Sequence, residues 1–223
     1  MNKLKLINKL KLRKYRDEFG LFIVEGDKLI EEIPKALLEF TINVDEIGER
    51  EFKKLSELTT PQNSIAVCRK PKINSSSDNS KLTIVLDRIQ DPNNVGAILR
   101  TTAAADLKDV ILLEGTADPF SSKSIRASMG AIFHLNLITM SETELLNSKL
   151  HLIAAHIKGD NYRETKIPSS SALILGNEGK GVSKNLLDVS KKITIPIHNI
   201  ESLNVNAAAA ILIFNFAQSK YNG

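Results

Sequence analysis

Three short groups of polar and glycine residues each follow an apolar run, and they contain the side chains best suited to chemistry. They are residues 87–100 with Asn94 and Arg100, residues 176–181 with Glu178, and residues 201–206 with Ser202 and Asn204. Glycines let a backbone approach a ligand closely, and the planar guanidinium of an arginine binds phosphate well. We therefore expect the chemistry of the protein in these three groups.

Each group also has a simpler explanation. Arg100 lies in an otherwise apolar helical segment and is either a solvent-facing charge or a phosphate ligand. Glu178 can be a solvated acid in a plain loop between a strand and a helix. Ser202 and Asn204 are common at helix starts and can cap the alanine-rich helix predicted at 207–216. The residue types alone leave these alternatives open.

Several common enzyme and metal sites have no support in the sequence. The glycines of 176–181 have the wrong order for a dinucleotide-binding loop, and neither a phosphate loop nor a G-x-S-x-G motif is present. Cys68 is the only cysteine, which excludes an intrachain disulfide and a thiolate-rich metal site. His151 and His156 have the wrong spacing for paired helical metal ligands. We therefore expect no metal.

Strand and helix patterns alternate from residue 82 onward and predict the framework that positions the three groups. Strands are predicted at 82–86, 110–113, 133–138, 152–156, 173–175 and 193–197, and helices at 96–105, 124–129, 143–148 and 207–216. Apolar runs bounded by turns are typical of strands buried on both faces. The pattern predicts an α/β domain with a mostly parallel sheet and a binding site at its strand ends.

The N-terminal part predicts a small, separate α/β domain. A basic amphipathic helix is expected before Gly20, followed by strands at 21–24, 41–44 and 64–68 and by helices at 28–40 and 49–58. The next residues are mainly small and polar, which is typical of a linker. The predicted division is 1–72 for the small domain, 73–81 for the linker and 82–223 for the larger domain.

The net charge of +4 permits a polyanionic partner, and the distribution of charge strengthens this indication. Seven basic residues precede the first acid, Asp17, and the candidate RNA contacts among them are Lys9, Lys11, Arg13, Lys14 and Arg16. Such a segment is either a solvated helix face or a nucleic-acid contact. No apolar run approaches the ~20 residues that cross a membrane, and no signal-peptide core is present, so we expect a cytoplasmic protein.

Taken together, the three groups resemble the three motifs of the SpoU-type branch of the SPOUT RNA methyltransferases. The matching runs are Asp-Pro-Asn-Asn-Val-Gly-Ala-Ile-Leu-Arg at 91–100, Leu-Gly-Asn-Glu-Gly-Lys-Gly-Val at 175–182, Ile-Pro-Ile at 195–197 and Glu-Ser-Leu-Asn-Val at 201–205. Residues 123–131 also look like that family. More weakly, residues 16–29 resemble the small RNA-binding domain that precedes the catalytic domain in many members.

The resemblance implies methyl transfer from S-adenosylmethionine to a ribose 2′-hydroxyl of RNA, by a homodimer whose α/β domain contains a trefoil knot. At the matching positions, the catalytic residues are Asn94, Arg100, Glu178, Ser202 and Asn204, and the cofactor-binding residues are Ala155, Leu175, Gly176, Ile195, Ile197 and Leu203. The separate N-terminal domain favours ribosomal RNA, with transfer RNA as the alternative. A non-catalytic RNA-binding protein of the same fold is a rival interpretation.

The family proposal for the position of Arg100 is that it orients or deprotonates the 2′-hydroxyl while a substrate phosphate polarises it. Because a guanidinium has a pKa above about 12, we favour binding and charge stabilisation over a literal base. The chain departs from the family pattern at Asn93 and Asp106, where Gly is usual, and in the turn at His198 and Asn199, which looks one residue short. Asn199 can adopt the left-handed conformation of Gly, so we expect a working loop of altered shape.

Overall fold

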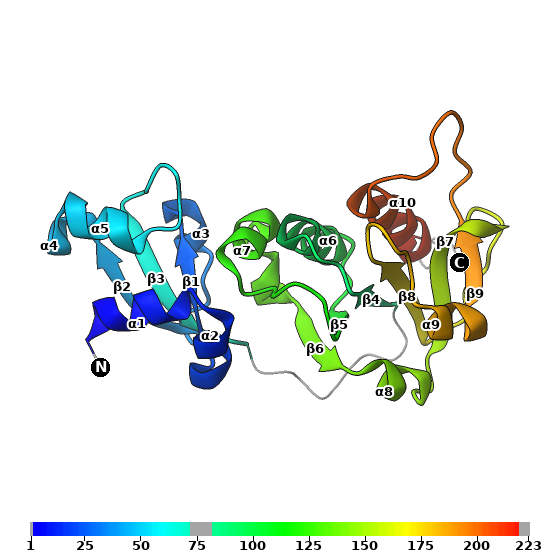
Figure 1. The fold of residues 1–223 in the computed structure, drawn as a ribbon, viewed down its shortest axis with the longest axis horizontal. Helices are drawn as coiled ribbons and strands as arrows, with labels where there is room; N and C mark the ends of the chain where they lie inside the picture. The colour runs from blue at the N-terminus through cyan, green and yellow to red at the C-terminus, as the bar shows by residue number, and fades with distance from the viewer. Residues whose placement is uncertain (1, 72–81, 219–223) are drawn as a thin grey trace.

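The computed structural model describes residues 2–71 and 82–218 of the chain (Figure 1). The linker predicted at 73–81 therefore lies outside the described residues. The N-terminal segment forms a three-stranded sheet, and the second segment forms a six-stranded sheet. Within these described ranges, no helix is long and apolar enough to cross a bilayer.

The three-stranded sheet is antiparallel, with the strand order β1-β3-β2. The elements of this segment are α1 (Lys3–Leu10), α2 (Arg13–Phe19), β1 (Leu21–Glu25), α3 (Asp27–Glu31), β2 (Leu38–Asn43), α4 (Val44–Ile47), α5 (Glu49–Leu55) and β3 (Ser64–Arg69). Helices α1 and α5 cover one face, where Ile7, Leu10, Phe52 and Leu55 pack against Ile65. The three predicted strands are present.

Two helix predictions for this segment are wrong. The helix predicted at 28–40 ends at Glu31, and a strand begins at Leu38. Pro34 explains the difference, because its ring blocks a helical turn and it has no amide to donate. The single helix predicted before Gly20 is two helices, and the break is at Leu12, whose backbone is extended (φ −97°, ψ 131°).

All strand pairs of the larger sheet are parallel, as predicted, and the order is β6-β5-β4-β8-β7-β9. Its strands are β4 (Thr83–Asp87), β5 (Asp109–Leu113), β6 (Asn136–Met140), β7 (His151–Asn161), β8 (Ser171–Gly176) and β9 (Lys191–Thr194). The helices are α6 (Pro92–Ala104), α7 (Ser122–Ser128), the 3-10 helix η1 (Ala131–His134), α8 (Glu142–Leu146), α9 (Lys184–Val189) and α10 (Val205–Gln218).

Both faces of this sheet are covered by helices (Figure 1). On the central strand β4, Ile84 and Leu86 pack in a cluster with residues of α6 and α10, whereas Val85 packs in a second cluster with residues of α8 and α9. Burial on both sides explains why these strands are continuous apolar runs. Four predicted boundaries are wrong: α6 begins at Pro92 rather than Gly96, η1 replaces the start of the strand at 133–138, β7 ends at Asn161 rather than His156, and β9 ends at Thr194 rather than Ile197.

Helix α6 packs closely against α7, and Gly96 is the point of closest approach. A Cβ at this position would lie 2.6 Å from the Cβ of Ala127 and would also overlap the carbonyl oxygen of Ser124. The two helices can therefore meet only because residue 96 has no side chain.

We expect Gly96→Ala to lower the free energy of unfolding by about 1–3 kcal/mol. Alanine normally stabilises a helix by about 1 kcal/mol relative to glycine, so a loss of stability identifies the overlap as the dominant effect. Urea denaturation measures the change. Gly179→Ala is the control, because the nearest atom to a Cβ there is 3.8 Å away; equal midpoints for the two variants would contradict this packing.

Candidate functional site

The acid of the glycine-rich turn and the asparagine of the first motif meet at the start of α6. The carboxylate of Glu178 accepts a hydrogen bond from the side chain of Asn94 (3.0 Å) and bonds from the amides of Gln90 and Asp91 (both 3.2 Å). Asp91 caps the helix by accepting the amide of Asn93, and Pro92 occupies its first turn. The predicted pair Asn94 and Glu178 is therefore joined directly.

Glu178 is held in its ionised form at neutral pH. Burial acts to raise the pKa of its carboxyl group, but the hydrogen bonds from Asn94 and from backbone amides, including its own, outweigh burial and lower the pKa. The N-terminal end of a helix also favours a negative charge. The carboxylate therefore acts as a hydrogen-bond acceptor that joins two loops, rather than as an acid.

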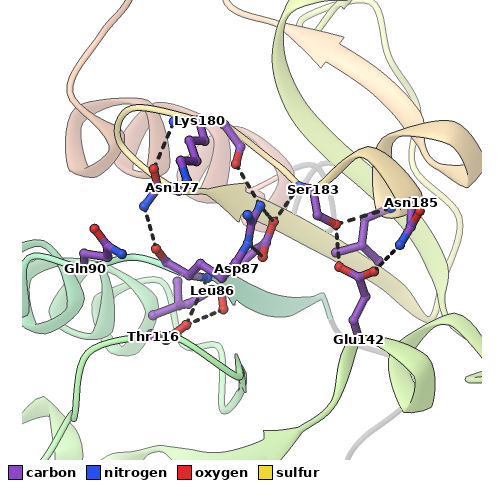
Figure 2. Close-up of polar contacts among 12 residues, drawn as sticks. Leu86, Asp87, Gln90, Thr116, Glu142, Asn177, Lys180, Ser183 and Asn185 are labelled. Atoms are coloured by element: carbon purple, nitrogen blue, oxygen red, sulfur yellow. Dashed lines mark hydrogen bonds and ion pairs between the residues drawn. The ribbon is translucent and has the colours of Figure 1, made fainter.

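Close backbone approach defines the turn that follows β8. A Cβ on Gly176 would lie 2.7 Å from the Cα of Val182 and closer still to its amide, so only glycine fits there. Asn177 organises the turn: its side-chain oxygen accepts the amides of Gly179 (3.0 Å) and Lys180 (2.9 Å), and its amide group donates to the carbonyl of Arg88 (2.9 Å). The turn is a fixed structure that is bound to the end of β4 (Figure 2).

A buried carboxylate, Asp87, holds the far end of the same turn. Only 1% of Asp87 is exposed, and its carboxylate accepts the amide of Ser183 (2.7 Å) and pairs with the guanidinium of Arg88 (2.7 and 2.9 Å). Arg88 in turn donates to the carbonyl of Gly181 (3.3 Å). Figure 2 shows Asp87 beside Ser183. The hydrogen bond with Asp87 raises the pKa of Arg88, so the guanidinium keeps its charge at every physiological pH.

Glu142, at the start of α8, supports the turn from the other side. It accepts hydrogen bonds from the hydroxyl of Ser183 (2.6 Å) and the side chain of Asn185 (2.8 Å), and these bonds lower the pKa of Glu142. None of Asp87, Asn177 and Glu142 was predicted as a site residue. Asp87 ends an apolar strand and Asn177 lies inside the glycine turn, which are signals that could have identified them.

Arg100 lies on the same helix as Asn94 but does not join this network. It is exposed, and it forms no hydrogen bond or ion pair with the part of the chain that the structure describes. Six residues of α-helix separate the two side chains by about 9 Å along the axis and about 120° around it. Arg100 is therefore available to a ligand rather than to the chain.

The third group flanks α10 and is only partly connected to the other two. Asn204 accepts the amide of Asn206 (2.9 Å) and caps α10, so the simpler explanation holds for that contact. Ile195 and Ala155 are half-buried against the core cluster that contains Leu175. Ser202, Leu203 and Ile197 lie in the segment between β9 and α10 that extends away from the sheet (Figure 1). No hydrogen bond joins them to Asn94, Arg100 or Glu178 in the described structure.

The basic residues of α1 and α2 are not equivalent. Lys9 lies over the rings of Tyr15 (4.9 Å) and Phe19 (5.7 Å), and Lys14 lies over Tyr15 (5.8 Å). Lys11 donates to the carbonyl of Lys54, and Arg13 forms an exposed ion pair with Asp17 (3.6 Å).

Of the five predicted RNA contacts, the structure contradicts Arg16. It is only 6% exposed, and its guanidinium is bound by Asp118 at 2.7 Å. A guanidinium that is buried and paired in this way is not available to RNA.

Comparison with known proteins identifies relatives for both segments. The model of the SpoU rRNA Methylase family matches residues 81–214, and that of the MRM3-like substrate binding domain matches residues 1–42. The 23S rRNA (guanosine(2553)-2′-O)-methyltransferase RlmP of Bacillus subtilis is 33% identical over 96% of this chain and 95% of its own. A TrmH-family protein from Porphyromonas gingivalis has a similar structure, with TM-score 0.84, 31% identity and 97% coverage of both chains. The AdoMet-bound rRNA methyltransferase of Sinorhizobium meliloti superposes with TM-score 0.84 and 25% identity over 97% of this chain and 94% of its own.

The hydrogen bonds of Glu178 to Gln90, Asp91 and Asn94 form a joint between the two loops. The lowered pKa of Glu178 predicts how this joint responds to acid. Because the folded-state pKa lies below the ordinary value of 4.5, the joint contributes stability at neutral pH and loses it only as pH falls through the lowered pKa. We expect the amide NMR signals of Gln90 and Asp91 to shift with a midpoint below 4.5. Glu178→Gln is the control and should abolish that transition; a wild-type midpoint above 4.5 would contradict the ionised joint.

Proposed function

The chain belongs to the SpoU rRNA methylase family, and on this premise we propose that it methylates a ribose 2′-hydroxyl of ribosomal RNA with S-adenosylmethionine as the donor. The observation that carries the proposal is the joint between Asn94 and Glu178, which brings the first two motifs together at one edge of the sheet. Ligands of open parallel sheets bind at this edge. The match to a ribosomal RNA methyltransferase over nearly its whole length supports the substrate class.

The residues proposed to hold the cofactor fit its chemistry. Ala155 and Ile195 are half-buried beside the core and offer apolar contact to an adenine ring. In the described structure, the backbone of residues 195–203 forms no backbone hydrogen bond, so its amides and carbonyls can bind a ligand. The backbone at Leu175, Gly176, Ile197 and Leu203 would supply the remaining contacts. When bound, S-adenosylmethionine supplies an electrophilic methyl group.

Arg100 is proposed to bind the phosphate next to the target ribose and to orient its 2′-hydroxyl. A hydroxyl is a poor nucleophile, so it must be aligned with the methyl carbon as it loses its proton. A fixed positive charge nearby stabilises the negative charge that develops on the oxygen. The exposure of Arg100 and its lack of a partner among the described residues support this role.

The other proposed catalytic residues act around this centre. Asn94 is oriented by Glu178, so its amide group is held at one position at the edge of the sheet. Ser202 is exposed and free to contact a ligand, whereas Asn204 uses its side-chain oxygen to cap α10 and retains its amide donor. We propose that Ser202 and Asn204 line the wall of the pocket opposite Arg100.

RNA is proposed to bind along α1 and α2 through Lys9, Lys11, Arg13 and Lys14. These residues lie within the region that matches the MRM3-like substrate binding domain. Contacts of this kind act mainly on phosphates, so the affinity should fall steeply with salt. Transfer RNA remains the alternative substrate, and both RNAs can be compared in one assay.

We also propose the division into a small RNA-binding domain, a linker and a knotted catalytic domain that acts as a cytoplasmic homodimer. Strand β7 shifts register against β9 between Ala155 and Asp160, which both pair with Ile193, and α10 packs against the core. The proposed trefoil knot rests on membership of the SpoU family. Two large apolar side chains on α10, Ile211 (37% exposed) and Phe214 (39% exposed), support a dimer contact there.

Methyl transfer from labelled S-adenosylmethionine tests the function. We expect the protein to label unmodified large-subunit ribosomal RNA at one nucleotide, and the product to resist alkaline cleavage there because its 2′-oxygen is blocked. Label on transfer RNA instead would change the substrate. An absence of S-adenosylmethionine binding in calorimetry would favour a non-catalytic RNA-binding protein.

Replacing the guanidinium of Arg100 tests its proposed role. We expect Arg100→Lys to retain S-adenosylmethionine affinity and to lose roughly 10²-fold in turnover, because an ammonium cannot reproduce the planar contact. Single-turnover kinetics with saturating RNA measure the effect. Arg50→Lys, an exposed arginine on α5, is the matched control; undiminished turnover in Arg100→Lys would remove Arg100 from the mechanism.

A further inference from the structure

The catalytic domain covers the second face of the three-stranded sheet. Phe22, Val24, Ala66 and Cys68 of the sheet form one buried cluster with Ile125 of α7 and Ile132 of η1. The ring of Phe22 lies 5.0 Å from that of Phe120 and 6.3 Å from that of Phe133, measured between centroids. The two segments therefore share a hydrophobic core, and Figure 1 shows α7 beside β1 and α3.

A buried ion pair fixes the orientation of this contact. Two nitrogens of Arg16, Nε and Nη2, bind the same oxygen of Asp118 at 2.8 and 2.7 Å. The third nitrogen, Nη1, donates to the carbonyls of Leu10 (2.7 Å) and Lys11 (2.8 Å) at the end of α1. Arg16 thus binds α1, α2 and the loop before α7 at one point. Apolar contact has no preferred direction, but this hydrogen-bond geometry permits only one arrangement.

The docked arrangement creates a cleft between the two segments. Its volume is about 500 Å³, and it is lined by Arg13, Asp17 and Lys70 on one side and by residues 112–120, Leu137, 139–141 and Glu144 on the other. These latter residues lie at the carboxyl ends of β5 and β6, the same edge of the sheet as the glycine turn after β8. A cleft of this size can admit a nucleotide.

The wall of the cleft is in direct contact with Arg88, which holds the glycine-rich turn after β8. Gly115 packs on the side chain of Arg88, so that a Cβ there would lie 3.1 Å from its Cγ. The hydroxyl of Thr116 accepts the amide of Arg88 (3.1 Å), and Arg88 binds the carbonyl of Gly181. A strand that crosses the cleft from α2 would therefore reach the site proposed for methyl transfer.

The charges that line the cleft do not themselves attract RNA. Arg13 and Lys70 are both paired with Asp17, at 3.6 and 2.6 Å, and Glu114 and Glu144 add negative charge to the lining. The unpaired charge that would attract a polyanion lies on the lysines of α1 and α2. The lysines of α1 and α2 would therefore attract the RNA, whereas other groups would align it.

We propose that Arg16 and Asp118 are positioning residues, which fix α1 and α2 so that an RNA strand crossing this cleft enters the methyl-transfer site in one register. The proposal rests on the function proposed above and extends it to substrate placement. Neither residue touches the RNA. Their effect is transmitted through the orientation of the N-terminal domain.

Two RNA substrates separate positioning from simple stability. The first is a long ribosomal RNA fragment that reaches α1 and α2, and the second is a short oligonucleotide with only the target nucleotide and its neighbours. We expect Arg16→Lys to raise the KM for the long RNA at least tenfold, while kcat, the KM for the short RNA and the S-adenosylmethionine affinity change less than twofold. A lysine keeps the charge but lacks the planar fork, through which separate nitrogens of Arg16 bind Asp118 and the two carbonyls.

Two further variants complete the test. Asp118→Asn can still accept the amide of Phe120, bonded at 2.9 Å, and should reproduce the effect of Arg16→Lys even if that variant folds poorly. Arg69→Lys is the matched control, because Arg69 forms an exposed pair with Glu39 in the same domain.

The positioning role would be overturned if Arg16→Lys and Asp118→Asn both left the KM for the long RNA unchanged. It would also be overturned if they raised the KM equally for both RNAs. If the wild-type protein methylates neither RNA, the proposed function fails instead. The ratio of long-RNA to short-RNA affinity, measured by filter binding without cofactor, then tests the pair independently of turnover.

Discussion

The proposed catalytic site depends on the contact between the carboxylate of Glu178 and the start of α6. The side chain of Asn94 and the amides of Gln90 and Asp91, which lie 84 to 88 residues earlier in the chain, all donate to this one group. An ionised acid is favoured at this end of a helix, where backbone amides lack helical partners. A single side chain therefore holds the second motif against the first.

The parallel sheet makes this contact geometrically possible. Strands β4 and β8 are neighbours in register, with Asp87 opposite Gly176, so the loops that follow them leave the sheet side by side. A buried carboxylate such as Asp87 is costly unless it is paired, and Arg88 and Ser183 satisfy it. Arg88 adopts a left-handed backbone (φ 57°), which is uncommon for a residue with a side chain. Its bonds to Thr116 and Asn177 maintain that conformation, so packing and site geometry are coupled.

Much of this arrangement could be predicted where the signal is local. Buried parallel strands are continuous apolar runs, and all six were identified near their observed positions. Asn199 (φ 65°) has the left-handed backbone expected of it, and Asp106 (φ 54°) has the same conformation where Gly is usual. The prediction of a helix at 28–40 is wrong because Pro34 interrupts the helix that the apolar periodicity of this segment favours. Asp87 was overlooked because its partner, the amide of Ser183, lies 96 residues away and no local pattern reports it.

Arg16 shows the limit of reading charge from sequence, because burial rather than residue type determines what a cation does. Six of the seven basic residues before Asp17 lie at least partly exposed, and one is sealed inside the contact between the two segments. Replacing a buried ion pair by apolar side chains often leaves stability unchanged or improves it, so stability is a weak reason for its presence. The apolar cluster around Phe22 already supplies cohesion. This cluster does not fix the relative orientation of the two segments. Arg16 fixes it, because its guanidinium binds one carboxylate and two carbonyls.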